Sequence, residues 1–120
     1  MTGANRPAGK EFAGGSWHRV AGADEIPDGA VRMVRAGARL VALSHVDGRY
    51  GALDNACPHM GGPLGQGTIE GGRLACPWHG REYDPLTGDC EGFKEKAAAF
   101  PVEVRADGVY IRVEPGGDKE

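Results

Sequence analysis

The sequence predicts an all-β protein, and two observations carry that prediction. In residues 109–113 (VYIRV), branched apolar side chains alternate with a tyrosine and an arginine, and a period of two gives a strand one buried and one solvent-facing side. The 21 glycines and 8 prolines are spread along the chain, as short strands joined by tight turns require. No segment has a sustained helical period: residues 94–100 (KEKAAAF) could form one or two helical turns at most.

The first predicted strands follow one another closely along the chain. Residues 30–35 and 38–46 flank Gly37, and residues 46–54 continue with an Asp-Gly turn at 47–48. An Asp-Gly pair between apolar runs favours the tight turn of a β-hairpin. We therefore expect consecutive antiparallel strands in this part of the chain.

The last predicted hairpin joins residues 101–105 (PVEVR) to residues 109–113 around the turn Ala-Asp-Gly. In the first of these strands, valines and charged residues alternate, so the two kinds of side chain should lie on opposite faces. The expected faces are buried for Val102 and Val104, and solvent-exposed for Glu103 and Arg105.

Length and composition bound the domain organisation. A chain of 120 residues suffices for one domain and is too short for two. We expect this domain over residues 16–114, preceded by a flexible, polar, Gly- and Ala-rich tail over 1–15 and followed by a frayed tail over 115–120. The apolar runs are far shorter than the ~20 residues of a membrane helix, so no membrane association is expected.

The net charge and the number of cysteines limit the kinds of partner and the cellular compartment that we expect. A formal net charge of −3 gives no basic patch, so nucleic acid is not an expected partner. The three cysteines cannot all pair with one another, and no apolar signal segment precedes a cleavage site. We therefore expect a reducing cytoplasm, where neighbouring cysteine and histidine favour a metal over a disulfide.

Two loops interrupt the strand pattern and carry the candidate metal ligands. The loops are residues 57–67 (CPHMGGPLGQG) and 76–80 (CPWHG), and the segment TIEGGRLA between them predicts a short hairpin. Each loop begins with Cys-Pro and contains one histidine; the four candidates are Cys57, His59, Cys76 and His79. Loops at the ends of adjacent strands could face each other across a gap the size of a metal centre.

The spacing of these residues discriminates between metals. Thiolate and imidazole ligands suit zinc, copper or iron–sulfur chemistry. Zinc fingers usually pair Cys with Cys and His with His at spacings of ~2–5 residues, whereas each pair here is mixed. A mixed pair can send its cysteine to one metal and its histidine to a neighbouring metal, so a two-metal centre is favoured. A zinc-stabilised binding module without redox activity remains the alternative.

The two loops, with the REYD that follows them (81–84), resemble the cluster loops of the Rieske 2Fe–2S family. The resemblance also covers the strands on either side, from about Trp17 to Val113. It implies a Rieske-type fold of small antiparallel sheets with a cluster-binding subdomain made of the two loops. It also implies one 2Fe–2S cluster, with two thiolates on one iron and two imidazoles on the other. The ligands would be Cys57, Cys76, His59 and His79.

The resemblance assigns surrounding residues to the cluster as well. Glycines let the backbone bend close to a cluster; those in the loops are Gly61, Gly62, Gly65 and Gly80. We expect three larger side chains, Met60, Leu64 and Trp78, to cover the cluster and exclude water. In the family, the tyrosine at the place of Tyr83 hydrogen-bonds a ligand cysteine sulfur.

Other reactive or charged residues receive ordinary structural interpretations. His18 and His45 lack a neighbouring cysteine and are expected to be strand residues, and Cys90 a small, partly buried one. The run 94–96 (KEK) predicts a solvated face. Arg81 stands where high-potential family members carry a serine, and we expect its guanidinium to be exposed and screened. Gly92-Phe93 replaces the Gly-Pro of many family members, which leaves the geometry of that loop open.

The resemblance implies an electron-transfer function. Ring-hydroxylating oxygenases of the family need a second, iron-binding domain, and only seven residues follow Val113. Respiratory Rieske subunits need a membrane anchor and a loop disulfide, and this chain has Gly62 and Trp78 at the disulfide positions. We therefore expect a soluble Rieske-type ferredoxin, without catalytic activity alone, that carries single electrons from a reductase to a terminal oxygenase or other acceptor. The alternative is a fixed Rieske small subunit of a larger oxidoreductase, such as an NADH-dependent nitrite reductase.

Overall fold

The computed structural model describes residues 16–58, 61–78, 80–90 and 92–113. Strands dominate this part of the chain, joined by one short 3-10 helix, η2. The strands are β1 (Ser16–Ala21), β2 (Ala30–Ala36), β3 (Arg39–Val46), β4 (Arg49–Asp54), β5 (Thr68–Glu70), β6 (Arg73–Ala75), β7 (Glu82–Tyr83), β8 (Ala99–Phe100), β9 (Val102–Arg105) and β10 (Gly108–Val113), and η2 is Leu64–Gln66. No helix in the described ranges is long and apolar enough to cross a membrane.

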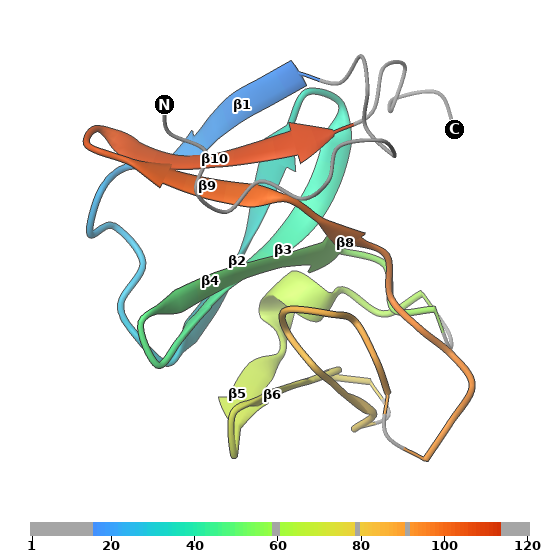
Figure 1. Cartoon of the computed structure of the whole chain (residues 1–120). Helices are drawn as coiled ribbons and strands as arrows, with labels where there is room; N and C mark the ends of the chain where they lie inside the picture. Colours follow the sequence, from blue (N-terminus) through green and yellow to red (C-terminus); the bar gives the residue numbers. More distant parts are fainter. Residues whose placement is uncertain (1–15, 59–60, 79, 91, 114–120) are drawn as a thin grey trace.

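The strands form three antiparallel sheets, which confirms the predicted fold class. An outer sheet has the order β1-β10-β9, a middle sheet β2-β3-β4-β8, and a small sheet β5-β6-β7. Figure 1 shows the outer sheet on one side of the middle sheet, and the β5–β6 hairpin with its neighbouring loops on the other side. The chain therefore has a base of two sheets and a subdomain that carries the candidate loops.

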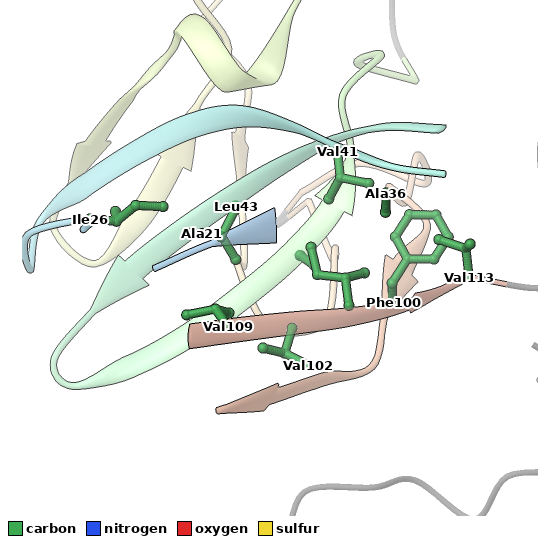
Figure 2. Close-up of a cluster of buried hydrophobic side chains, with 11 residues drawn as sticks. Ala21, Ile26, Ala36, Val41, Leu43, Phe100, Val102, Val109 and Val113 are labelled. Atoms are coloured by element: carbon green, nitrogen blue, oxygen red, sulfur yellow. The ribbon is translucent and has the colours of Figure 1, made fainter. Parts of the chain in front are cut away.

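The middle sheet is buried on both faces. Because neighbouring side chains of a strand point to opposite faces, Val41 and Leu43 pack toward the outer sheet, whereas Ala42 packs toward the loops. All three are 0% exposed. In Figure 2, the labelled side chains of β3 and β10 meet between the two sheets of the base. The opposite face of the middle sheet is thus the floor on which the loop-bearing subdomain rests.

The predicted hairpins of the middle sheet are confirmed. β2 pairs with β3 and β3 with β4, both antiparallel. Asp47 and Gly48 have φ angles of 52° and 79°, the left-handed values that a two-residue hairpin turn demands. The Asp28 carboxylate accepts hydrogen bonds from both of their N–H groups, at 3.0 and 2.7 Å. A side chain from the preceding loop therefore closes this turn.

The predicted alternation of β9 is wrong at two positions. Glu103 is 5% exposed and Val104 is 55% exposed, the reverse of the expectation. β9 is the edge strand of the outer sheet, so Val104 has a neighbouring strand on one side only. Arg105 donates two hydrogen bonds to Glu103 Oε1, at 3.1 and 2.9 Å, and this ion pair allows the carboxylate to be buried.

Two short strands were not expected from the sequence. Residues 94–100 contain no helical turn among those described; instead Ala99–Phe100 forms β8, which pairs with β4. Glu82–Tyr83 forms β7, which pairs with β6. Both strands have two residues, too few for a period of two to appear, but they attach the candidate loops to the sheets.

Candidate metal centre

The first loop (57–67) begins where β4 ends and is closed by its own backbone. The Cys57 N–H donates to the Gly62 carbonyl at 2.8 Å, and the Gly61 N–H donates to the Cys57 carbonyl at 2.7 Å. Gly61 has a φ angle of 81°, in the left-handed region that favours glycine. The loop therefore folds back on its cysteine within five residues.

The second loop (76–80) repeats this pattern after β6. The Cys76 N–H donates to the Arg81 carbonyl at 2.8 Å, the Gly80 N–H donates to the Cys76 carbonyl at 3.0 Å, and Gly80 has a φ angle of 74°. The two cysteines thus occupy equivalent positions in two matching turns. His59 and His79, as well as Met60, lie outside the described residues, so their ligand roles remain predictions.

Asn55 anchors the first loop, and the sequence reasoning did not identify it. Its carbonyl accepts from the Leu64 N–H at 2.7 Å, and its side-chain Oδ1 accepts from the Gly65 N–H at 2.8 Å. A methyl group on Gly65 would lie 2.7 Å from that Oδ1 atom and 2.7 Å from Met33 Cβ, so only glycine fits. The signal available in the sequence was an asparagine directly after a strand, which often bonds nearby backbone.

The two loops meet at the candidate thiols. Cys57 and Cys76 are each 3% exposed and belong to one apolar cluster with the fully buried Leu64. A methyl group on Gly62, in the first loop, would lie 3.0 Å from Cys76 Sγ and 3.0 Å from the Trp78 ring, in the second. The glycine therefore lets the loops approach each other closely, with both sulfur atoms shielded from water.

Tyr83 reaches one of these thiols from the small sheet. Its side chain is fully buried, and its hydroxyl oxygen lies 3.1 Å from Cys57 Sγ. Burial raises the pKa of Tyr83 well above its usual value, and the hydrogen bond to Cys57 raises it further. The hydroxyl therefore keeps its proton and can donate a hydrogen bond to a cysteine thiolate.

The expected cover residues divide into two groups. Leu64 is 0% exposed and packs in the core beneath the loops, so it does not form an outer cover. Trp78 is 58% exposed, and its ring lies against the position of Gly62. Trp78 is therefore a surface side chain at the meeting point of the two loops.

A third loop, residues 84–98 (residue 91 apart), holds the second loop from the side and corrects two expectations. The side chain of Arg81 is only 16% exposed, and its Nη1 atom lies 2.8 Å from Glu95 Oε1. Its guanidinium also stacks 3.6 Å from the centre of the Phe93 ring. The prediction of an exposed, screened Arg81 is therefore wrong, because the third loop folds over its guanidinium. Glu95 is not simply part of a solvated run, because it pairs with Arg81. Gly92, with a φ angle of 87°, turns the chain there.

Cys90 and the two remaining histidines belong to segments other than the two candidate loops. Cys90 is 5% exposed, more buried than expected, and forms an isolated backbone bridge with Tyr83. His45 hydrogen-bonds the Ile26 carbonyl through Nδ1 at 2.8 Å and stacks on Tyr50. His18 is half-buried in β1. Among the described residues, which omit 59 and 79, no three His, Cys, Asp or Glu side chains gather as a metal site.

Comparison with protein families identifies this arrangement. Residues 16–106 match the sequence model of the Rieske [2Fe-2S] domain. This chain belongs to the Rieske family. The match runs from β1 through β9 and includes all three loops of the Rieske domain, and a domain of this family binds one 2Fe–2S cluster.

Some relatives of this Rieske domain are much longer than it, and others are close to its own length. It is 37% identical to human apoptosis-inducing factor 3 over 90 residues, which are 73% of this chain but 15% of that protein. It is 31% identical to the ferredoxin component of the naphthalene 1,2-dioxygenase/salicylate 5-hydroxylase systems of Ralstonia, over 82% of this chain and 97% of that protein. A solved complex of reduced oxygenase and oxidized ferredoxin in carbazole 1,9a-dioxygenase contains a chain with a TM-score of 0.73 and 31% identity, covering 82% of this chain and 94% of that one.

The described residues of this Rieske domain fit a 2Fe–2S cluster. Two buried thiols lie in equivalent turns, a glycine sits where a methyl group would press on Cys76 Sγ, and a hydroxyl donor contacts Cys57 Sγ. A thiolate that accepts such a hydrogen bond is stabilised, as ligands of a metal centre require. The donor set and its surroundings thus suit the group that the family binds.

Proposed function

We propose that this chain is a Rieske-type ferredoxin that carries single electrons from a reductase to a terminal oxygenase or another redox acceptor. Cys57 and Cys76 would hold one iron of the cluster, and His59 and His79 the other. The observation that carries the proposal is the pair of matching turns, each of which begins with a buried cysteine. The likeness to a dioxygenase ferredoxin component over 97% of that protein's length supports the role of carrier.

The residues of the chain have separate tasks in this function. When bound, the cluster supplies a centre that accepts and gives up one electron. The Tyr83 hydroxyl lies 3.1 Å from Cys57 Sγ, and it would donate a hydrogen bond to this sulfur as a thiolate and stabilise its negative charge. The apolar cluster around Leu64 and Leu74, both 0% exposed, keeps water from the inner side of the loops. Trp78, 58% exposed, lies on the outer side, where a partner could approach.

We also propose that the chain works in the cytoplasm. The support is its three cysteines, which cannot all pair, together with buried Cys57 and Cys76, which must stay reduced to bind iron. The proposed extent of the functional domain is residues 16–114. The formal net charge of −3 does not favour nucleic acid as a partner.

The metal content of the purified protein tests this proposal. We expect about two irons and two acid-labile sulfides per chain and a Rieske-type electron paramagnetic resonance (EPR) signal after reduction. Alanine at Cys57, His59, Cys76 or His79 should abolish the signal. The matched variants His18→Ala, His45→Ala and Cys90→Ala should retain it. One zinc and no iron in anaerobically prepared protein would instead favour the zinc-stabilised module.

A fixed subunit or domain of a larger oxidoreductase is the second candidate. One observation favours it: the chain spans only 15% of the length of the human and mouse apoptosis-inducing factor 3 proteins that it resembles. In such an assembly the same cluster would relay electrons within one complex. The two candidates differ in how the protein associates with its partners, not in the ligands of the cluster.

A further inference from the structure

The Arg81–Glu95 ion pair lies beside the second loop and has no role in the ligand set. Arg81 follows that loop directly, and its carbonyl accepts the Cys76 N–H at 2.8 Å. Its side chain points into the third loop, where Nη1 lies 2.8 Å from Glu95 Oε1 and the guanidinium stacks on Phe93. The pair thus joins the backbone of a candidate ligand to the third loop.

The charge of Arg81 is placed where it can act on the candidate thiols. Only 16% of its side chain is exposed, so water screens it less than a surface guanidinium. Its backbone carbonyl accepts the Cys76 N–H at 2.8 Å, so Arg81 lies next to one of the candidate thiols in the fold. Tyr83, two residues further along the chain, places its hydroxyl 3.1 Å from Sγ of the other candidate, Cys57.

Glu95 offsets this charge. Its carboxylate contacts the guanidinium directly and is itself only 31% exposed, so the pair contributes nearly zero net charge next to the loops. A lone cation at this place would favour the reduced cluster, which carries one more negative charge than the oxidised cluster. The pair therefore removes an electrostatic bias toward reduction.

We propose that Glu95 is a positioning residue for electron transfer: by pairing with Arg81, it cancels a positive charge beside the second loop and keeps the reduction potential of the cluster low. This inference rests on the proposed ligand set. It assigns a function to an acidic residue of the third loop that carries no ligand atom.

Glu95→Gln tests the proposal, because glutamine keeps the shape and the oxygen that faces Arg81 while removing the negative charge. Voltammetry should show a higher midpoint potential than in the wild type, by about a threefold to tenfold change in the reduction equilibrium, or ~28 to ~59 mV at 59 mV per tenfold. The double variant Arg81→Gln/Glu95→Gln restores zero net charge and should return close to the wild-type potential.

Glu70→Gln is the matched control, because Glu70 is an exposed glutamate in β5 and the same charge is removed. Its shift should be smaller than that of Glu95→Gln and should vanish at high salt. Equal shifts in the two variants, or no return in the double variant, would overturn the proposal. If Glu95→Gln does not bind a cluster, the variants Arg81→Lys and Arg81→Gln are compared instead. Arg81→Gln removes the positive charge and should have a lower reduction potential, whereas Arg81→Lys keeps the charge and should not. Equal potentials in these two variants would refute the inference.

The same measurements separate this inference from the function on which it rests. A wild-type protein without iron or a Rieske EPR signal would overturn the proposed function. A normal signal in the wild type and in Glu95→Gln, with unchanged potential, would overturn only the role of Glu95.

Discussion

Tyr83 shows how one residue connects the fold to a candidate ligand of the cluster. Its backbone pairs with Leu74 of β6 and forms a bridge to Cys90, while its hydroxyl contacts Cys57 Sγ. Three segments of the chain thus fix the position of one donor. A donor held in this way needs no reorganisation when the charge on the sulfur changes.

We predict that Tyr83→Phe lowers the reduction potential. Phenylalanine fills the same buried volume but removes the hydrogen bond that stabilises the more negative, reduced state. The expected fall is a few tens of millivolts, on the order of one net hydrogen bond, and voltammetry measures it. Tyr110→Phe is the control, because the Tyr110 hydroxyl bonds Asp107 in the outer sheet. An unchanged potential in Tyr83→Phe, with an intact EPR signal, would show that the contact does not influence the cluster.

At the same scale, the sequence predicted the candidate ligands but not their ionic neighbours. The two Cys-Pro motifs stand out because cysteine and histidine are rare and their spacing is specific. Arg81 and Glu95, by contrast, are fourteen residues apart and separated by β7, and only the tertiary fold brings their charged atoms to 2.8 Å. The exposure of Val104 was also mispredicted, since alternation indicates the face of a strand but not whether another strand covers it.

The β3–β4 hairpin shows how an element acquires a pH-dependent stability. The Asp28 carboxylate accepts hydrogen bonds from Gly48 and Asp47, and these bonds, with the nearby His45, lower the pKa of Asp28 below its ordinary value of 3.8. When the pKa of a carboxyl group is lower in the folded protein than in the unfolded protein, the ionised group stabilises the fold at pH values above the unfolded-state pKa. This stabilisation is lost as the pH falls through the folded-state pKa.

We therefore predict that Asp28→Asn destabilises the protein at neutral pH and has less effect in acid. The difference in the free energy of unfolding between wild type and variant should shrink as the pH falls below ~4. Denaturant unfolding at a series of pH values measures it. Glu82→Gln, which removes an exposed carboxylate of β7 outside the turn, controls for net charge. A difference that does not depend on pH would contradict this account of the turn.

Gly51 determines how closely β4 approaches the third loop. A methyl group there would overlap the Pro85 carbonyl oxygen, which belongs to backbone and cannot swing aside. We predict that Gly51→Ala destabilises the protein by about 1–3 kcal/mol through overpacking, measured by denaturant unfolding. Gly22→Ala is the matched control, because the nearest atom to its added methyl lies 3.4 Å away, an ordinary contact. Equal stabilities of the two variants would mean that the third loop moves freely on the sheet and can make room for the methyl group.

Elements were predictable where a local signal exists. The β2–β3–β4 meander and the β9–β10 hairpin follow from apolar alternation and from glycine-containing turns. β7, β8 and η2 have two or three residues each, which is too short for a local pattern to indicate them, and β8 pairs with the sequence-distant β4. These short elements nevertheless attach the loops to the base.

At the scale of the whole molecule, the middle sheet separates two buried clusters. The cluster toward the outer sheet stabilises the base, and the cluster on the other face contains Cys57, Cys76 and Tyr83. The candidate centre therefore lies on a floor of paired strands, while Trp78 and Phe93, 58% and 54% exposed, face outward from the second and third loops. Such an arrangement leaves the loop-bearing end accessible to other proteins.

The strength with which this end of the molecule binds other proteins distinguishes a diffusing carrier from a fixed subunit. A carrier must bind its donor and its acceptor in turn, which requires weak contacts over a transient interface below ~1,200 Å². We therefore predict that the protein purifies alone and elutes as a single small species in gel filtration. Mixed with a reductase or an oxygenase, it should associate only at low salt, because rim charges contribute mainly to encounter rates and are screened by salt. Co-purification with a larger subunit in fixed stoichiometry through high salt would instead assign the chain to a permanent complex, in which the exposed aromatic side chains are covered by that subunit.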